Sequence, residues 1–169
     1  MIFDKLASLF VILNFGSLML LSFLNQVNIF KVNKIANRLL GVYFLLWAFF
    51  WVDEIVFLVY GVELNQNWQL LLRGVQYFTP ILFYFTVVFY SNPSFKFKKA
   101  IPQHLILPIG YIILLYFFAK SNSLTINYIL IFLMLSQTLF YTLASYYKVR
   151  KHQKVVMMYS SQKMEIDLS

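Results

Sequence analysis

The chain has 169 residues, of which 61% are hydrophobic and only 12% are charged, and its mean hydropathy is +0.72. Soluble domains typically carry about 25% charged residues, so this composition excludes an ordinary globular protein and predicts that most of the chain lies in lipid. Cysteine is absent, which excludes disulfides and thiol chemistry, and the net charge of +8 comes from short basic clusters between apolar runs, a pattern that favours membrane orientation over nucleic-acid binding.

Five continuous apolar runs are long enough to cross about 30 Å of hydrocarbon, which takes about 20 helical residues. They cover residues 6–24, 39–60, 70–90, 101–119 and 124–147. Helices are expected because each then satisfies its backbone hydrogen bonds within its own segment. We therefore predict an all-α fold, a polytopic transmembrane helix bundle over residues 1–147, followed by a basic cytoplasmic loop or tail over residues 148–169.

The first run begins near Met1 and has to be compared with a cleaved signal peptide. Asp4 and Lys5 cancel in the segment that would need a positive charge, and no A-x-A cleavage site follows. The apolar stretch is also longer than the core of a typical signal peptide. We expect a retained transmembrane helix.

Basic residues gather in alternate connections between the runs, whereas residues 61–67 and 121–123 hold none. By the positive-inside rule, this pattern predicts an N-terminus outside and a cytoplasmic C-terminus. The three basic clusters are Lys31, Lys34 and Arg38, then Lys96, Lys98 and Lys99, and finally Lys148, Arg150, Lys151 and Lys154.

Two carboxylates lie just past the middle of the second run, where an ionised side chain costs about 2.5 to 3.5 kcal/mol on insertion scales. Asp53 and Glu54 are adjacent, so on a helix they point about 100° apart and do not form a general acid and base pair. Arg73 in the third run is the natural counter-charge. Two interpretations remain open, a structural ion pair within the membrane and the floor of a ligand pocket open to the outside.

The third run carries a polar and aromatic stripe at three- and four-residue spacing, so one helix face should point into the bundle. Pro80, near the middle, is expected to free a backbone carbonyl and kink the helix. In the fifth run, Gln137, Tyr141 and Ser145 are expected to make hydrogen bonds between helices. The candidate residues of the pocket or ion pair are Asp53, Glu54, Gln69, Arg73, Gln76, Tyr77 and Tyr84.

The sequence does not support an enzyme active site. Neither His104 nor His152 has a carboxylate spaced with it on one helix face, which argues against a metal site. The glycine-rich motifs of nucleotide phosphate sites are missing, and no histidine and carboxylate accompany a serine at comparable depth. We therefore expect no catalysis, no cofactor and no metal.

Two segments carry a resemblance to a known family. They are NKIANRLLGVYFLLWAFFWVDEIV (residues 33–56) and GVQYFTPILFYFTVVFYSNPSFKFKKAIPQHLILPI (residues 74–109). The pattern is a basic N-x-x-A-N-R-x-L-G entry to the second run, an aromatic third run that ends in Y-x-x-P, and a basic F-K-F-K-K connection before a fourth run that contains proline. It resembles the membrane-embedded N-terminal half of bacterial AraC-type transcriptional regulators.

The resemblance implies a seven-helix sensor in the bacterial cytoplasmic (inner) membrane, with a cytoplasmic helix-turn-helix domain that binds DNA. In the family pattern, the tail KVRKHQKVVMMYSSQKMEIDLS would continue into two further spans and the DNA-binding helices. We therefore expect a fragment without a nucleic-acid contact of its own, because a helix-turn-helix needs two packed amphipathic helices. Anionic lipid headgroups are the expected partners of the basic residues Lys148, Arg150, Lys151 and Lys154.

Three function classes follow from these observations. The leading hypothesis is a sensory or signalling membrane domain of a transcriptional regulator, in which a small molecule from the outer side shifts the packing of the bundle. A small transporter or permease subunit is the alternative, with Asp53, Glu54 and Arg73 as an intramembrane polar path. An odd number of spans and the lack of an internal repeat count against the alternative. A scaffold without a ligand is the third class, and the sequence leaves a homodimer open.

Overall fold

The computed structural model describes residues 2–29, 31, 33–95, 97–121 and 123–167. These residues form α-helices joined by short connections, and no strand occurs among them, which confirms the all-α prediction. Lys96 and the side chains of Lys98 and Lys99, from the second predicted basic cluster, lie outside the described part. The helices are α1 (Ile2–Val27), α2 (Lys34–Phe50), α3 (Val52–Tyr60), α4 (Gln66–Gln76), α5 (Thr79–Ser91), α6 (Phe97–Ser121) and α7 (Leu124–Asp167).

Among the described residues, four to five helical segments are long and apolar enough to span a membrane. Four segments are long and apolar enough to cross by themselves: Leu6–Val27, Gln66–Ser91, Pro102–Ser121 and Leu124–Met158. The pair α2 and α3 meets the same test when taken together, but it is bent by 41°. Large apolar side chains on the outer surface, such as Phe10, Phe117 and Phe132, are 53 to 69% exposed. Such a surface is suited to contact with lipid.

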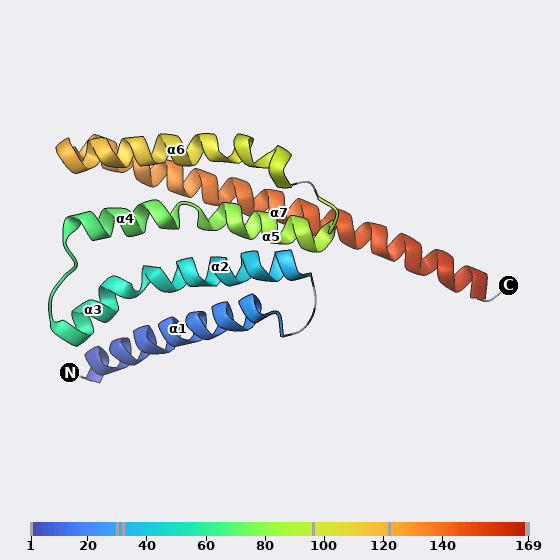
Figure 1. The fold of residues 1–169 in the computed structure, drawn as a ribbon, viewed down its shortest axis with the longest axis horizontal. Helices are drawn as coiled ribbons and strands as arrows, with labels where there is room; N and C mark the ends of the chain where they lie inside the picture. Colours follow the sequence, from blue (N-terminus) through green and yellow to red (C-terminus); the bar gives the residue numbers. More distant parts are fainter. Residues whose placement is uncertain (1, 30, 32, 96, 122, 168–169) are drawn as a thin grey trace.

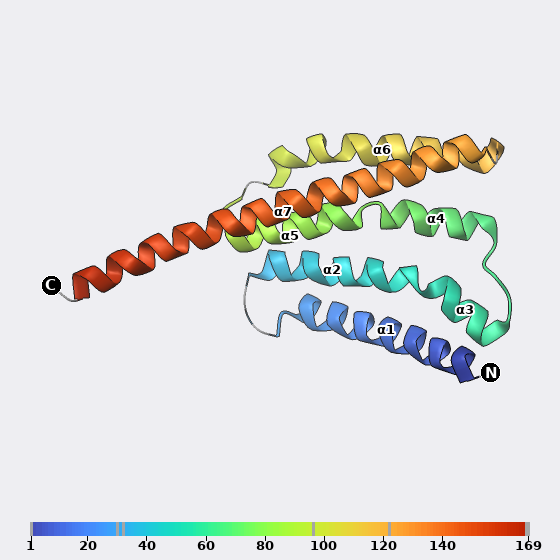
Figure 2. The same ribbon diagram turned by 180° about the vertical axis from the view of Figure 1, so that it is seen from behind.

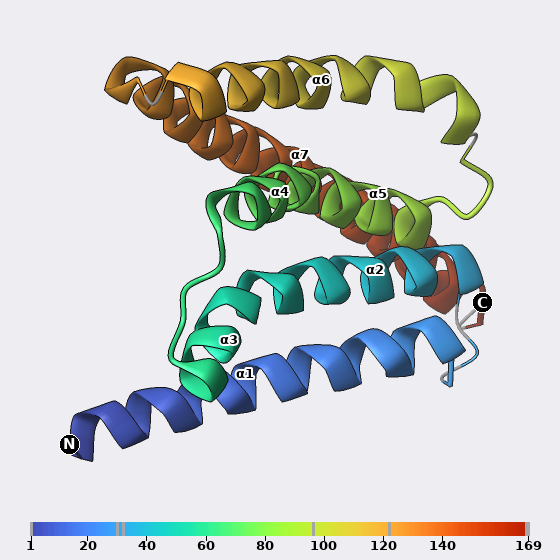
Figure 3. The ribbon, with the colours of Figure 1, turned by 60° about the vertical axis from the view of Figure 1, so that its left-hand side comes forward.

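The helices lie roughly in a row, with α1 beside α2, α2 beside α5, and α6 along α7 (Figure 1). Seen from behind, α7 crosses α5 obliquely and then extends beyond the other helices (Figure 2). The connections α1–α2 and α5–α6 lie at one end of the bundle, whereas the N-terminus and the α3–α4 connection lie at the other (Figure 3). The basic α1–α2 connection and the basic part of α7 therefore lie toward the same end.

The predicted basic entry to the second run anchors α2 to its neighbours. Asn33 caps α2, accepting hydrogen bonds from the N–H groups of Ile35 and Ala36, and its amide donates to the carbonyl of Phe89 on α5 at 2.8 Å. The buried Asn37 donates to the side-chain oxygen of Asn28 and accepts from the hydroxyl of Tyr90. The two asparagines thus tie the α1–α2 turn to the end of α5.

Close approach of α1 and α2 depends on Gly41 in α2. A Cβ added to Gly41 would lie 2.6 Å from Cγ of Gln26 and 2.9 Å from the backbone oxygen of Ser22. Only glycine leaves enough room at this crossing, because those contacts are shorter than van der Waals distances.

The third span is broken where Pro80 was expected to disturb it. Helix α4 ends at Gln76 and α5 begins at Thr79, with Pro80 in its first turn. Pro80 has no N–H to donate to the carbonyl of Gln76, which instead accepts from the hydroxyl of Thr79 at 2.8 Å. In addition, the carbonyl of Tyr77 accepts from the amide of Gln137 on α7 at 2.8 Å. The expected interhelical bond of Gln137 is confirmed. Instead of a marked kink, the structure shows a short break in the helix within one span, Gln66–Ser91, and α4 and α5 stay nearly in line (Figure 1).

Helix α7 continues through the predicted end of the transmembrane region. Its 44 residues, Leu124–Asp167, correspond to about 66 Å of helix, roughly twice the thickness of the hydrocarbon layer. No break in the helix marks residue 148. The basic segment from Lys148 onward is therefore described as helix, where the sequence suggested a loop or tail.

Candidate ligand-binding hollow

A polar hollow of about 340 Å³ lies between α2–α3 and α4. The bend at Trp51 turns α3 away from α4, so the two helices diverge toward the α3–α4 connection (Figure 1). We call this site the polar hollow. Its lining residues are Phe50, Trp51, Asp53, Glu54, Gln69, Leu72, Arg73 and Gln76.

Asp53 is half-buried and holds the α3–α4 connection in place. Its Oδ1 accepts from the backbone N–H of Leu64 at 3.0 Å, and its Oδ2 accepts from Nε2 of Gln69 at 3.4 Å. Neutral donors thus satisfy part of the hydrogen-bonding capacity of this carboxylate. Glu54, one residue later, is exposed at the edge of the hollow.

Arg73 lies on the opposite wall from the two carboxylates, but among the described residues no salt bridge within 4.0 Å joins it to Asp53 or Glu54. The ion pair considered from the sequence is therefore not formed, whereas the three charged residues do line one hollow. Arg73 also borders a second, smaller hollow of about 300 Å³ toward α6 and α7, where Asn127 contributes an amide. Its guanidinium therefore lies between two polar spaces.

The aromatic members of the predicted stripe belong to the core and do not line the polar hollow. Tyr77 is 2% exposed and stacks on Tyr111 with ring centroids 3.9 Å apart. Tyr84 lies 5.6 Å from the ring of His104 and 5.5 Å from that of Tyr141. His104 Nδ1 is 2.7 Å from the Tyr141 hydroxyl, so this histidine has a packing role between α6 and α7. Of the seven predicted residues, five therefore line the polar hollow, whereas Tyr77 and Tyr84 pack in the core.

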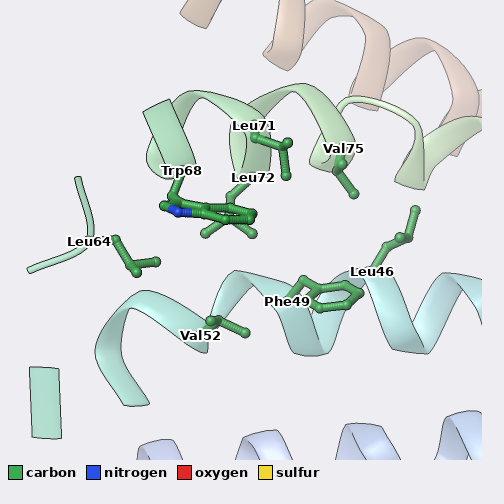
Figure 4. A pocket seen from close by; sticks show the side chains of 8 residues that line it. All are labelled: Leu46, Phe49, Val52, Leu64, Trp68, Leu71, Leu72 and Val75. Atoms are coloured by element: carbon green, nitrogen blue, oxygen red, sulfur yellow. The ribbon is translucent and has the colours of Figure 1, made fainter. Parts of the chain in front are cut away.

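An apolar groove of about 520 Å³, absent from the sequence-based expectations, lies beside the same helix contact. Figure 4 shows side chains of α4 facing those of α2 and α3 across it. Leu72 lines both the groove and the polar hollow, so α4 presents an apolar side to one space and a polar side to the other. The groove is lined by Leu46, Phe49, Val52, Leu64, Trp68, Leu71, Leu72 and Val75.

The four predicted lipid-binding residues all lie exposed on the extended part of α7. Their surroundings differ. Arg150 donates from Nε to the hydroxyl of Tyr146 at 2.9 Å, and its guanidinium lies 5.5 Å from the centre of that ring. Lys148 and Lys151 instead border a crevice against the end of α5.

No family model, curated protein or solved structure matches the chain. In the described part, no group of three metal-ligating side chains is close enough to hold a metal ion. The polar hollow presents one guanidinium, two carboxylates and two amides on facing walls, groups that can recognise a ligand by charge and hydrogen bonds. Such a set suits a small polar ligand that carries both donors and acceptors.

Proposed function

We propose that the chain is a membrane-embedded sensory domain of a transcriptional regulator in the bacterial inner membrane, with its N-terminus outside and its C-terminus cytoplasmic. The observation that carries the proposal is the polar hollow, placed where two spans are interrupted. One interruption is the bend at Trp51 and the other is the break between Gln76 and Thr79. A ligand that enters here from the outer side would favour one spacing of α3 and α4 over another.

A route from this hollow to the far end of the bundle is supported by contacts. The break after Gln76 is held by the hydrogen bond from Gln137 on α7 to the Tyr77 carbonyl. Helix α7 then packs along α5 and leaves the bundle as a single helix. A change at the break would thus alter the direction or rotation of α7. The output domain, a DNA-binding helix-turn-helix on the cytoplasmic side, is suggested solely by the resemblance to AraC-type regulators.

A transporter or permease subunit remains the alternative, because Arg73 borders two polar hollows that would form the start of a path. The packing of side chains next to these hollows favours the sensor. Tyr77, Tyr111, Leu115 and Leu130 form a core cluster in which each residue is at most 6% exposed. A solute would have to displace this cluster to cross the bundle.

The proposal can be tested by joining Ser169 to a DNA-binding domain that acts as a dimer and measuring a transcriptional reporter in cells grown on different media. The native chain is expected to give an output that depends on the medium. Arg73→Gln should abolish this dependence, because the hollow loses its only cation. Arg150→Gln, which removes the same charge from α7, should retain it.

Equal amounts of each variant in the membrane, measured by immunoblotting, are the control for folding. An output that never varies, together with exchange of a labelled solute by the purified chain in vesicles, would contradict the sensor and support the transporter.

A further inference from the structure

A crevice of about 310 Å³ separates the end of α5 from the basic part of α7. The end of α5 lies at the end of the bundle that holds the basic α1–α2 connection, whereas the α3–α4 connection beside the polar hollow lies at the other end (Figure 1). We call the crevice between α5 and α7 the lysine crevice. Its lining residues are Val88, Ser91, Asn92, Phe95, Lys148, Lys151, His152 and Val155.

One face of α7 supplies the positive wall of the lysine crevice. Lys148, Lys151, His152 and Val155 follow one another at intervals of three, one and three residues, which places them on a single face of the helix. Two ammonium groups and an imidazole thus face the same space. No carboxylate lines it, so no ionised side chain of the lining repels an anion.

The facing wall, at the end of α5, adds hydrogen-bonding groups. Oδ1 of Asn92 accepts from the backbone N–H of Ser94 at 3.3 Å and from its hydroxyl at 2.8 Å. Its side-chain NH₂ has no acceptor among the described residues, so two donors remain available to a ligand. The carbonyl end of α5 carries partial negative charge, which helps to explain why lysines lie beside it.

The depth of the lysine crevice matches the headgroup layer. The span Gln66–Ser91 has 26 residues, about 39 Å of helix, which exceeds about 30 Å of hydrocarbon. A helix of this length centred on the hydrocarbon would extend about 4 to 5 Å past it at each end, close to one turn at the end of α5. Val88, Phe95 and Val155 form an apolar part of the lining, suitable for the first methylene groups of an acyl chain.

From this combination we infer that the lysine crevice binds the phosphate of an anionic phospholipid, with Lys148 and Lys151 as its cationic ligands and the Asn92 amide as a neutral donor. The site needs no ligand in the polar hollow and does not depend on the proposed sensory function. A bound lipid would bridge α5 and α7 at the point where α7 leaves the bundle. The lipid composition of that leaflet would thereby influence the position of the extended helix.

The chain contains a matched control for this site. Arg150 and Lys154 are neighbours of the crevice lysines on the same helix, but neither lines the crevice. Lys148→Gln with Lys151→Gln removes the same two charges as Arg150→Gln with Lys154→Gln. A diffuse attraction of α7 to an anionic surface would respond equally to the two double variants.

The test is a binding titration of the purified full chain in neutral detergent with short-chain phosphatidylglycerol, and with short-chain phosphatidylcholine for comparison. Lys148→Gln with Lys151→Gln should weaken phosphatidylglycerol binding by about tenfold to thirtyfold, and the control pair by about twofold or less. Asn92→Leu, which leaves the charge unchanged, should also weaken it. Unaltered helical circular dichroism shows that each variant is folded.

Equal weakening by the two double variants would overturn the proposal, as would phosphatidylcholine binding as tightly as phosphatidylglycerol. Inorganic phosphate that binds as tightly as the lipid would also overturn it, because the site would then recognise a free anion.

Discussion

Alanine at Gly41 is expected to destabilise the bundle by about 1 to 3 kcal/mol, the usual cost of adding atoms to a packed site. The new Cβ would lie 2.9 Å from the backbone oxygen of Ser22, which cannot move without shifting α1. Alanine at Gly16 is the matched control, since nothing lies within 4 Å of its added Cβ. There the change should be neutral or stabilising by up to about 1 kcal/mol, because alanine favours helix more than glycine does.

Unfolding of the two variants in mixed micelles of rising sodium dodecyl sulfate, followed by circular dichroism, gives both free energies. Gly41→Ala is expected to lower the free energy of unfolding, and Gly16→Ala is expected to leave it unchanged or to raise it. If Gly41→Ala is as stable as Gly16→Ala, then α1 and α2 do not cross as closely as described.

Alanine at Asp53 is expected to release the α3–α4 connection, whereas alanine at Glu54 is not. Asp53 accepts the Leu64 N–H and the Gln69 amide, and hydrogen bonds to a charged group contribute about 1.5 to 3 kcal/mol each. Loss of the bond to Leu64 should therefore speed local amide exchange by about tenfold to a hundredfold. Glu54→Ala removes the same charge from the same turn and leaves that bond intact.

Hydrogen–deuterium exchange of a peptide that covers residues 61–65 measures this difference directly. Equal acceleration by the two variants would mean that the carboxylate charge matters and the Asp53 hydrogen bonds do not. If neither variant speeds amide exchange, then Asp53 does not hold the α3–α4 connection in place.

The sequence was informative wherever local chemistry decides the structure. Apolar length predicts the spans, because a helix in lipid has no other way to satisfy its backbone. Pro80 predicts a freed backbone carbonyl in the third span for the equally local reason that it lacks an N–H. The buried face of α7 follows the predicted spacing, with Gln137, Tyr141 and Ser145 each 3% exposed. Gln137 and Tyr141 make the expected bonds to other helices, but the expected bond of Ser145 is wrong, because its buried hydroxyl has no partner among the described residues.

Other features depend on contacts between distant residues and could not be predicted. The 41° bend at Trp51 occurs without proline or glycine, and it decides which side of α3 faces α4. The break after Gln76 interrupts the helical stripe, so Gln69, Arg73 and Gln76 line the hollow while Tyr77 and Tyr84 pack in the core. Asn33 and Asn37 carry no local signal for their contacts with Phe89 and Tyr90 on α5.

The polar hollow is expected to admit water from the outer side of the membrane, and this can be measured directly. Because the chain has no native cysteine, single cysteines can be placed at Asn65, Gln76 and Ile113 and treated in intact cells with a membrane-impermeant thiol reagent, which needs a hydrated thiolate. Position 65, in the α3–α4 connection, and position 76, in the polar hollow, should react. Position 113, a 51% exposed side chain on the lipid-facing surface of α6, should not. An unreactive cysteine at 76 beside a reactive one at 65 would contradict the hollow, and an unreactive cysteine at 65 would contradict the orientation.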